Sequence, residues 1–252
     1  MLDWYGVAPG RHDETEPPAF WTSAEWQAWQ HLFAAVPNPE PAPRIADPVP
    51  AGPSVALPPS GADEQVTVSQ ALARRRSRRR LHGPVPLDRL SHPLRGLFRP
   101  EPGGAVPSSA NCGGLHELTP YLCAVDVAGL PSGLYECQGE TLIRAFAPED
   151  WPERVARRVG RYLGQRDRPV PAAVLWRVRW PVVLHRYHPG GLLTAFWDAG
   201  AALQTAYLLT EEAGLAGCAC AALPSADDLT DLGWLPAQHA FVAAFAIGLD
   251  LS

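Results

Sequence analysis

Prolines divide this chain into two parts near residue 65. Twelve of its 28 prolines fall within the first 60 residues, and a proline fixes φ and has no backbone N–H to donate. Residues 37–59 should therefore be largely extended, in a polyproline conformation. We predict a Pro-rich arm over residues 1–65 and a folded domain over residues 66–252.

The arm contains one candidate for a short helix, from Thr22 to Phe33. Ser23 can cap it, because a serine hydroxyl accepts hydrogen bonds from the first free N–H groups of a helix. Trp26, Trp29 and Phe33 fall along one stripe of that helix. Such aromatic side chains need an apolar surface to pack against, which is either the domain or a partner subunit.

The composition is that of a folded protein with reduced thiols. Hydrophobic residues make up 46% of the chain, and no apolar run approaches the roughly 18 residues of a membrane helix. The N-terminus lacks the features of a signal peptide, so we expect a cytoplasmic protein without a membrane partner. Five irregularly spaced cysteines argue against a disulfide framework. Cys218 and Cys220 match no common zinc pattern, so we expect no metal site.

The pattern of apolar residues predicts an α+β domain. Helices are expected where apolar residues recur at helical spacing, and strands where they alternate or run together between turn residues. The expected helices are Val68–Arg80, Trp151–Leu163 and Thr194–Ala213, the last followed by Gly214 as a C-terminal cap. The expected strands are Pro120–Asp126, Gly133–Glu136, Ala172–Val183 and Phe241–Leu249, in a sheet of four or five strands.

Positive charge is concentrated around Ser77. Six arginines surround this serine between residues 74 and 80, in a chain whose net charge is −5. Arginine forms bidentate hydrogen bonds with phosphate oxygens, so the run predicts a phosphate site. The alternative is a solvated basic run, which is common in proteins. The acidic balance of the whole chain argues against a nucleic-acid partner.

A second motif, Ser109 to His116, contains small residues whose backbone can approach a flat ligand closely. The long helix adds Asp-Ala-Gly from residue 198 and then Gln204. The chain has no Gly-x-Gly-x-x-Gly after a strand, no Walker loop and no Gly-x-Ser-x-Gly elbow. The common nucleotide-binding motifs and a serine hydrolase are therefore not indicated.

Taken in order, these motifs resemble the nitroreductase superfamily. The matching segments are Arg-Arg-Ser-x-Arg at 75–79, Gly-Gly-Leu-His at 113–116 with Tyr121, Gly-Leu-Tyr at 133–135, Asp-Ala-Gly-x-x-x-Gln at 198–204 and Gly-Leu at 214–215. They are most similar to the SagB-type azoline dehydrogenases of azole-containing peptide biosynthesis, over residues 65–250. The resemblance implies a nitroreductase-like α+β fold, with a central, mostly antiparallel sheet flanked by helices. It also implies FMN bound at a homodimer interface.

The resemblance further implies a reaction and a set of cofactor residues. Such enzymes oxidise a peptide-borne thiazoline or oxazoline to the azole, beside a cyclodehydratase. The positions implied to contact FMN come from the arginine run, the glycine loop, the long helix and the turn after it. They are Arg75, Arg76, Ser77, Arg79, Ser109, Asn111, Gly113, Gly114, Gln204 and Gly217.

Catalysis also requires a base, because dehydrogenation releases a proton. The family carries Lys-Tyr about twelve residues before the acidic residue of its Asp/Glu-x-Gly motif, and this chain has Arg186-Tyr187 at that place. Arginine stays protonated in proteins. Tyr187 is therefore the candidate base, and Arg186 a candidate anchor for a negatively charged group. The alternative is that both residues are structural.

Departures from the family pattern leave the activity open. Thr119 stands where relatives often have glutamate, with Glu117 two residues earlier as a substitute. Ala201 replaces a frequent histidine, and Asp250 follows the last glycine where a basic residue is common. The expected function is FMN-dependent oxidation of peptide azolines. The alternatives are an FMN oxidoreductase of the same fold with another peptide or carrier-bound substrate, and a flavin-poor scaffold that binds a biosynthetic partner.

Overall fold

The computed structural model describes residues 52–59, 66–101, 104–187 and 190–250, and every described residue belongs to one compact unit of the chain. The helix expected from Thr22 to Phe33 lies outside these residues. No helix in the described part of the chain is both long and apolar enough to cross a membrane.

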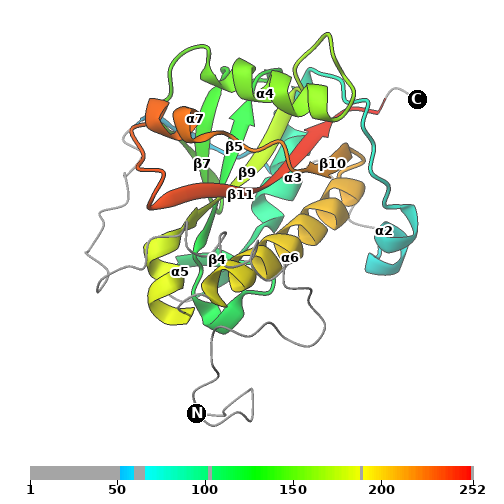
Figure 1. Cartoon of the computed structure of the whole chain (residues 1–252). Coiled ribbons are helices and arrows are strands. Elements are labelled where there is room, and N and C mark those ends of the chain that lie inside the picture. Colours follow the sequence, from blue (N-terminus) through cyan, green and yellow to red (C-terminus); the bar gives the residue numbers. More distant parts are fainter. Residues whose placement is uncertain (1–51, 60–65, 102–103, 188–189, 251–252) are drawn as a thin grey trace, which may run out of the picture. The chain divides into compact units, whose positions relative to one another are not determined.

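A seven-stranded sheet forms the centre of this unit (Figure 1). Its strands follow the order β1-β8-β7-β5-β9-β11-β10, and all neighbours are antiparallel. The strands are β1 (Ser54–Ala56), β5 (Leu118–Ala124), β7 (Gly133–Gln138), β8 (Thr141–Arg144), β9 (Ala172–Arg179), β10 (Ala216–Cys220) and β11 (His239–Gly248). Two small pairs accompany it, β2 (Val85–Pro86) with β6 (Val127–Ala128), and β3 (Phe98–Glu101) with β4 (Gly104–Pro107). The α+β class and the mostly antiparallel sheet are confirmed, but the expected four or five strands were too few.

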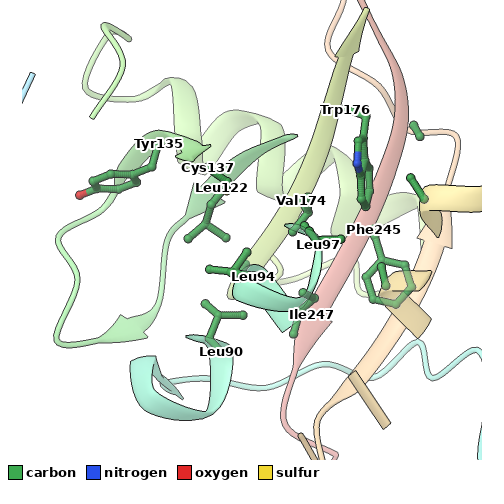
Figure 2. Packing of buried hydrophobic residues seen from close by; sticks show 14 of the residues in the cluster. Leu90, Leu94, Leu97, Leu122, Tyr135, Cys137, Val174, Trp176, Phe245 and Ile247 are labelled. Atoms are coloured by element: carbon green, nitrogen blue, oxygen red, sulfur yellow. The ribbon is translucent and has the colours of Figure 1, made fainter. Parts of the chain in front are cut away.

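Helices cover both faces of the sheet. The described residues form α2 (Val68–Arg74), α3 (Leu87–Gly96), α4 (Trp151–Tyr162), α5 (Trp180–Tyr187), α6 (Gly191–Glu212), α7 (Ala226–Asp231) and the short 3₁₀ helix η1 (Cys112–Gly114). Of these, α2 packs on α6. On one face, α3 and the alanine side of α6 pack on residues such as Leu122, Val174 and Phe245 (Figure 2). On the other face, α4 and α7 pack on the strand residues whose side chains point to that face, such as Cys123 and Leu175. Because successive strand residues point to opposite faces, each central strand feeds both cores.

β1 lies in the segment expected to be polyproline, yet it pairs with β8 at the edge of the sheet. The reason is a proline-free run between Pro53 and Pro58, which keeps its backbone donors. Leu57 N donates to Glu140 O at 2.9 Å, just past the strand. The folded unit therefore reaches back into the predicted arm.

Two expected elements end earlier than the sequence predicts. The helix expected over 68–80 ends at Arg74, and the strand expected over 172–183 ends at Arg179, where α5 begins. The long helix starts at Gly191 and ends at Glu212. Gly214 follows it with φ of 60°, which confirms its expected role as a C-terminal cap.

Candidate functional site

The candidate site is arranged along α6. Asp198, in the first half of this helix, contacts the glycine loop, whereas Tyr207 and Glu211, in the second half, contact the arginine run. With a rise of 1.5 Å per residue, Asp198 and Tyr207 lie about 14 Å apart along the axis. The two motifs therefore meet one element at separate places.

The arginine run leaves α2 and crosses the second half of α6. The Ser77 Oγ and Tyr207 Oη atoms are hydrogen-bonded at 2.8 Å, and the Arg75 guanidinium lies over the Tyr207 ring, 5.1 Å from its centroid. Arg78 N donates to the carbonyl of Gly217 on β10 at 3.0 Å. Because these contacts hold residues 75–78 in a non-helical path, α2 ends at Arg74 and is shorter than expected.

The arginines of the run differ in what they bind. Arg78 forms ion pairs with Glu211 and with Asp250, the latter at 2.9 Å. Arg76 turns back to the carbonyl oxygens of Ala73 and Arg75, at 3.0 and 2.8 Å. Arg75 and Arg79 have no acidic partner within the described ranges. Among the arginines implied to contact FMN, these two guanidinium groups are therefore available for an anion.

The glycine loop is closed by side chains at both of its ends. Asn111 accepts a hydrogen bond from His116 N at 2.9 Å and donates to Glu117 at 3.1 Å. Both carboxylate oxygens of Asp198 accept from Cys112 N, at 3.0 and 2.9 Å. Gly113 lies within the loop at φ of 61°, a conformation that favours glycine. Asp198 thus fixes the start of the loop to α6, and Asn111 ties its start to its end.

Two buried carboxyl groups lie together beneath this loop. Glu117 is 1% exposed and Asp198 is 4% exposed. Burial, followed by the hydrogen bond with Asp198, raises the pKa of Glu117 to about 7. Burial and the same aspartate raise the pKa of the Cys112 thiol to about 11, so this thiol is neutral and is not a nucleophile at neutral pH.

Tyr187 lies against the glycine loop. A Cβ at Gly113 would collide with the Tyr187 hydroxyl oxygen, so the loop and the end of α5 are in close contact. Arg186 beside it is exposed. Both residues lie at the C-terminal end of α5. The predicted catalytic pair is therefore brought to the loop through Tyr187.

The other predicted cofactor residues lie around the cavities beside the glycine loop or on the outer side of α6. Ser109 and Asn111 line a cavity of about 20 Å³ together with Asp198, which is room for one water molecule. A larger cleft of about 420 Å³ opens beside it, lined among others by His116, Thr119 and Glu136. Gln204 is exposed on α6, away from the buried Asp198 side.

Sequence reasoning did not single out Tyr207. It named Glu117 only as a substitute for a family glutamate and Asp198 only as part of the Asp-Ala-Gly motif, without the contacts described above. Tyr207 follows Gln204 by three residues, so helical spacing could have placed it near the same face. The five cysteines are free thiols, and no cluster of potential metal ligands occurs among the described residues.

Comparison of the sequence with known protein families shows the family of the chain. Residues 72–249 match the description "Nitroreductase family". The chain belongs to the nitroreductase family. No curated protein matches it in sequence.

Solved structures of low sequence identity share the nitroreductase fold. A putative nitroreductase from Ralstonia eutropha superposes with a TM-score of 0.62 at 18% identity, covering 86% of this chain and 97% of that one. The E. coli microcin synthetase McbBCD complex with truncated pro-MccB17 bound gives 0.58 at 16% identity, covering 88% and 86%. A putative nitroreductase from Anabaena variabilis gives 0.58 at 16%, covering 88% of this chain and 45% of that one.

Proposed function

We propose that this nitroreductase-family chain is a SagB-type, FMN-dependent dehydrogenase that oxidises thiazoline or oxazoline rings of a peptide to thiazole or oxazole. The observation that carries the proposal is the two-ended site along α6. A cationic loop lies at one end, and a glycine loop in contact with Tyr187 lies at the other. Such a site fits an elongated ligand with a phosphate at one end and a flat ring at the other.

The donors at each end suit the corresponding part of FMN. Arg75 and Arg79 keep their guanidinium groups for a phosphate, and Ser77 adds a hydroxyl. Gly114, at φ of 64°, has open space where a Cβ would stand, so its backbone can lie against a ring. Ser109, Asn111 and Gly113 belong to the same end, and Gln204 lies on α6 between Asp198 and Tyr207. Gly217 accepts from Arg78 N, at the phosphate end. Arg76 contributes to the charge of the phosphate end rather than to direct contact.

FMN, when bound, supplies the acceptor for the hydride that leaves the ring. The protein must then receive the accompanying proton. Tyr187 lies at the glycine loop with its hydroxyl against Gly113, and we assign the proton transfer to it: its deprotonated, phenolate form takes the proton that leaves the ring. Arg186 is exposed beside Tyr187 and, being permanently protonated, orients an anionic group of the substrate.

We further propose a peptide substrate, a homodimer and a cyclodehydratase partner. Likeness of fold to a microcin synthetase complex that was solved with its pro-peptide bound supports a peptide as the substrate class. A homodimer is supported by large apolar side chains that α6 leaves exposed, namely Leu193, Phe196 and Trp197.

The first test is the visible absorption spectrum of the purified protein, with the flavin released by heat and identified by chromatography. We expect about one FMN per protomer. Incubation with an azoline-bearing peptide should then remove two hydrogens per ring, measured by mass spectrometry. Tyr187→Phe should retain flavin and lose this turnover, because the phenyl ring cannot move a proton.

The outcomes separate the alternatives. Bound FMN without azoline oxidation would indicate another peptide or carrier-bound substrate. A colourless protein that also fails to bind added FMN would contradict the proposal and favour a partner-binding scaffold. Full turnover by Tyr187→Phe would remove Tyr187 from the mechanism.

A further inference from the structure

We propose that Tyr207 is a positioning residue of the anion-binding loop, which presents the Ser77 hydroxyl as a hydrogen-bond donor and holds the Arg75 guanidinium in place. The inference rests on the proposed FMN function, and it assigns to the phosphate end of the site a residue that lies outside the arginine motif. Tyr207 itself does not touch the phosphate.

Tyr207 is fixed to the sheet by two contacts. Its ring packs edge-to-face on Phe245 of β11, with centroids 4.7 Å apart and planes at 88°. Its hydroxyl oxygen accepts a hydrogen bond from the backbone N–H of Ala219 at 2.9 Å. Ala219 lies on β10, the edge strand of the sheet, where backbone donors on the outer side have no neighbouring strand. The position of the phenol is therefore set by two strands of the central sheet.

The direction of the hydrogen bonds follows from this anchor. The N–H of Ala219 can only donate, so Tyr207 Oη is the acceptor of that bond. If Ser77 also donated to Tyr207, the phenolic proton would be left without an acceptor. The arrangement in which both the Ala219 N–H and the phenolic proton have an acceptor is the one with Tyr207 donating to Ser77 Oγ over the 2.8 Å separation. The proton of the exposed Ser77 hydroxyl then points away from the protein, toward an incoming acceptor.

The ring of Tyr207 also supports Arg75. The Arg75 guanidinium lies 5.1 Å from the ring centroid, a cation–π distance. Stacking on a ring face leaves the N–H edge of a guanidinium available for bidentate bonds in its own plane. The two acidic groups nearest the run, Glu211 and Asp250, are occupied by Arg78. Tyr207 thus presents one hydroxyl donor and one cation together, which is the donor set that a phosphate monoester requires.

The test compares FMN with riboflavin, which lacks the phosphate. Dissociation constants of both flavins would be measured by fluorescence quenching for the wild type, Tyr207→Phe, Ser77→Ala and the double variant. Tyr207→Phe keeps the ring that packs on Phe245 and under Arg75, and it loses only the hydroxyl. We expect about a tenfold loss of FMN affinity, as for one hydrogen bond to a charged group, and no change for riboflavin.

The double variant distinguishes positioning from independent effects. If Tyr207 acts through Ser77, the double variant should bind FMN no more weakly than Ser77→Ala alone, a non-additive result. Tyr162→Phe, at an exposed tyrosine on α4, is the matched control and should change neither affinity.

Four results would overturn the inference. Additive losses in the double variant would mean that Tyr207 acts independently of Ser77. An equal loss of riboflavin and FMN affinity by Tyr207→Phe would mean general damage to the fold. If the wild type bound riboflavin as tightly as FMN, the arginine run would not bind the phosphate, but the protein would still be a flavin enzyme. If it bound neither flavin, the proposed function would be overturned as well.

Discussion

At the scale of single residues, the glycine loop depends on two neighbouring buried carboxyl groups, Glu117 and Asp198. Asp198 accepts both hydrogen bonds from Cys112 N, and Glu117 holds Asn111. The titratable groups that face Glu117 are Asp198 on α6 and the Cys112 thiol on η1. Within the part of the chain that the structure describes, no cation contributes to the pKa of Glu117. Its raised pKa therefore makes the folded state sensitive to pH near neutrality.

Glu117 should lower the stability of the protein as the pH rises. Its folded pKa of about 7 lies above its ordinary value of 4.5, so its favourable contribution is complete below pH 4.5 and is lost as the pH rises through 7. Between pH 5 and pH 8, we expect the free energy of unfolding of Glu117→Gln to increase by about 2 kcal/mol relative to that of the wild type, measured by urea unfolding. Glu149→Gln, at an exposed carboxylate, should show no such gain. A constant difference between Glu117→Gln and wild type across this range would contradict the assignment.

Gly113 and Gly114 form a matched pair for testing the loop. Both have φ near 60°, so alanine costs about 1–2 kcal/mol of backbone strain at either position. At Gly113 the new Cβ also meets the Tyr187 hydroxyl, whereas at Gly114 nothing lies within 4 Å. We therefore expect Gly113→Ala to be the more destabilising substitution in urea unfolding. Equal effects would show that Tyr187 does not pack on the loop.

At the scale of elements, local patterns identified most helices and strands but not where tertiary contacts end them. The alternation of Val174, Trp176 and Val178 predicted β9 correctly. The strand was extended too far because Val182 and Val183 look like further strand residues, although Pro181 at the second position of α5 is a helix-start signal. Nothing local ends α2 at Arg74. It ends there because Ser77 and Arg78 are held by Tyr207 and Glu211, about 130 residues later.

Asp228 should be the residue that ties α7 to α4. Burial opposes its charge, but hydrogen bonds from Arg158 and Ser225 outweigh burial and hold the pKa of Asp228 below its ordinary value. Ser225 N donates to it at 2.6 Å, which closes the N-terminal cap of α7. We expect Asp228→Asn to lower the free energy of unfolding by about 2 kcal/mol at pH 7.

The loss in Asp228→Asn should also depend on pH. A lowered pKa stabilises the fold above the ordinary pKa of the group, and this stability disappears as the pH falls through the lowered value. The difference from wild type, measured by urea unfolding at pH 7 and pH 3, should therefore shrink in acid. Asp227→Asn, an exposed neighbour on the same turn, is the control. Equal destabilisation by both substitutions would contradict a specific role for Asp228.

At the scale of the whole molecule, the order of motifs along the chain predicted the family, but it could not show how the two ends of the site are joined. The joining element is α6, whose inner side carries Asp198 and whose outer side carries Gln204. Helical spacing alone does not distinguish these sides, because alanines and leucines surround the whole helix. Only its packing on the sheet decides which side is buried (Figures 1 and 2).

The outer side of α6 leads to a prediction about assembly. Trp197 is 59% exposed and lies next to Phe196, which is 48% exposed. Exposed aromatics of this size are typical of interface centres, and the interface proposed here joins two copies of this chain through α6. Trp197→Lys should therefore weaken the dimer at least about tenfold, measured by light scattering across a dilution series. Because Gln204 lies on the same helix, FMN affinity should fall together with dimer content. As a control, Leu235→Lys, at an equally exposed residue after α7, should change neither the dimer affinity nor the FMN affinity. If the Trp197→Lys protein stayed dimeric, the interface would lie elsewhere.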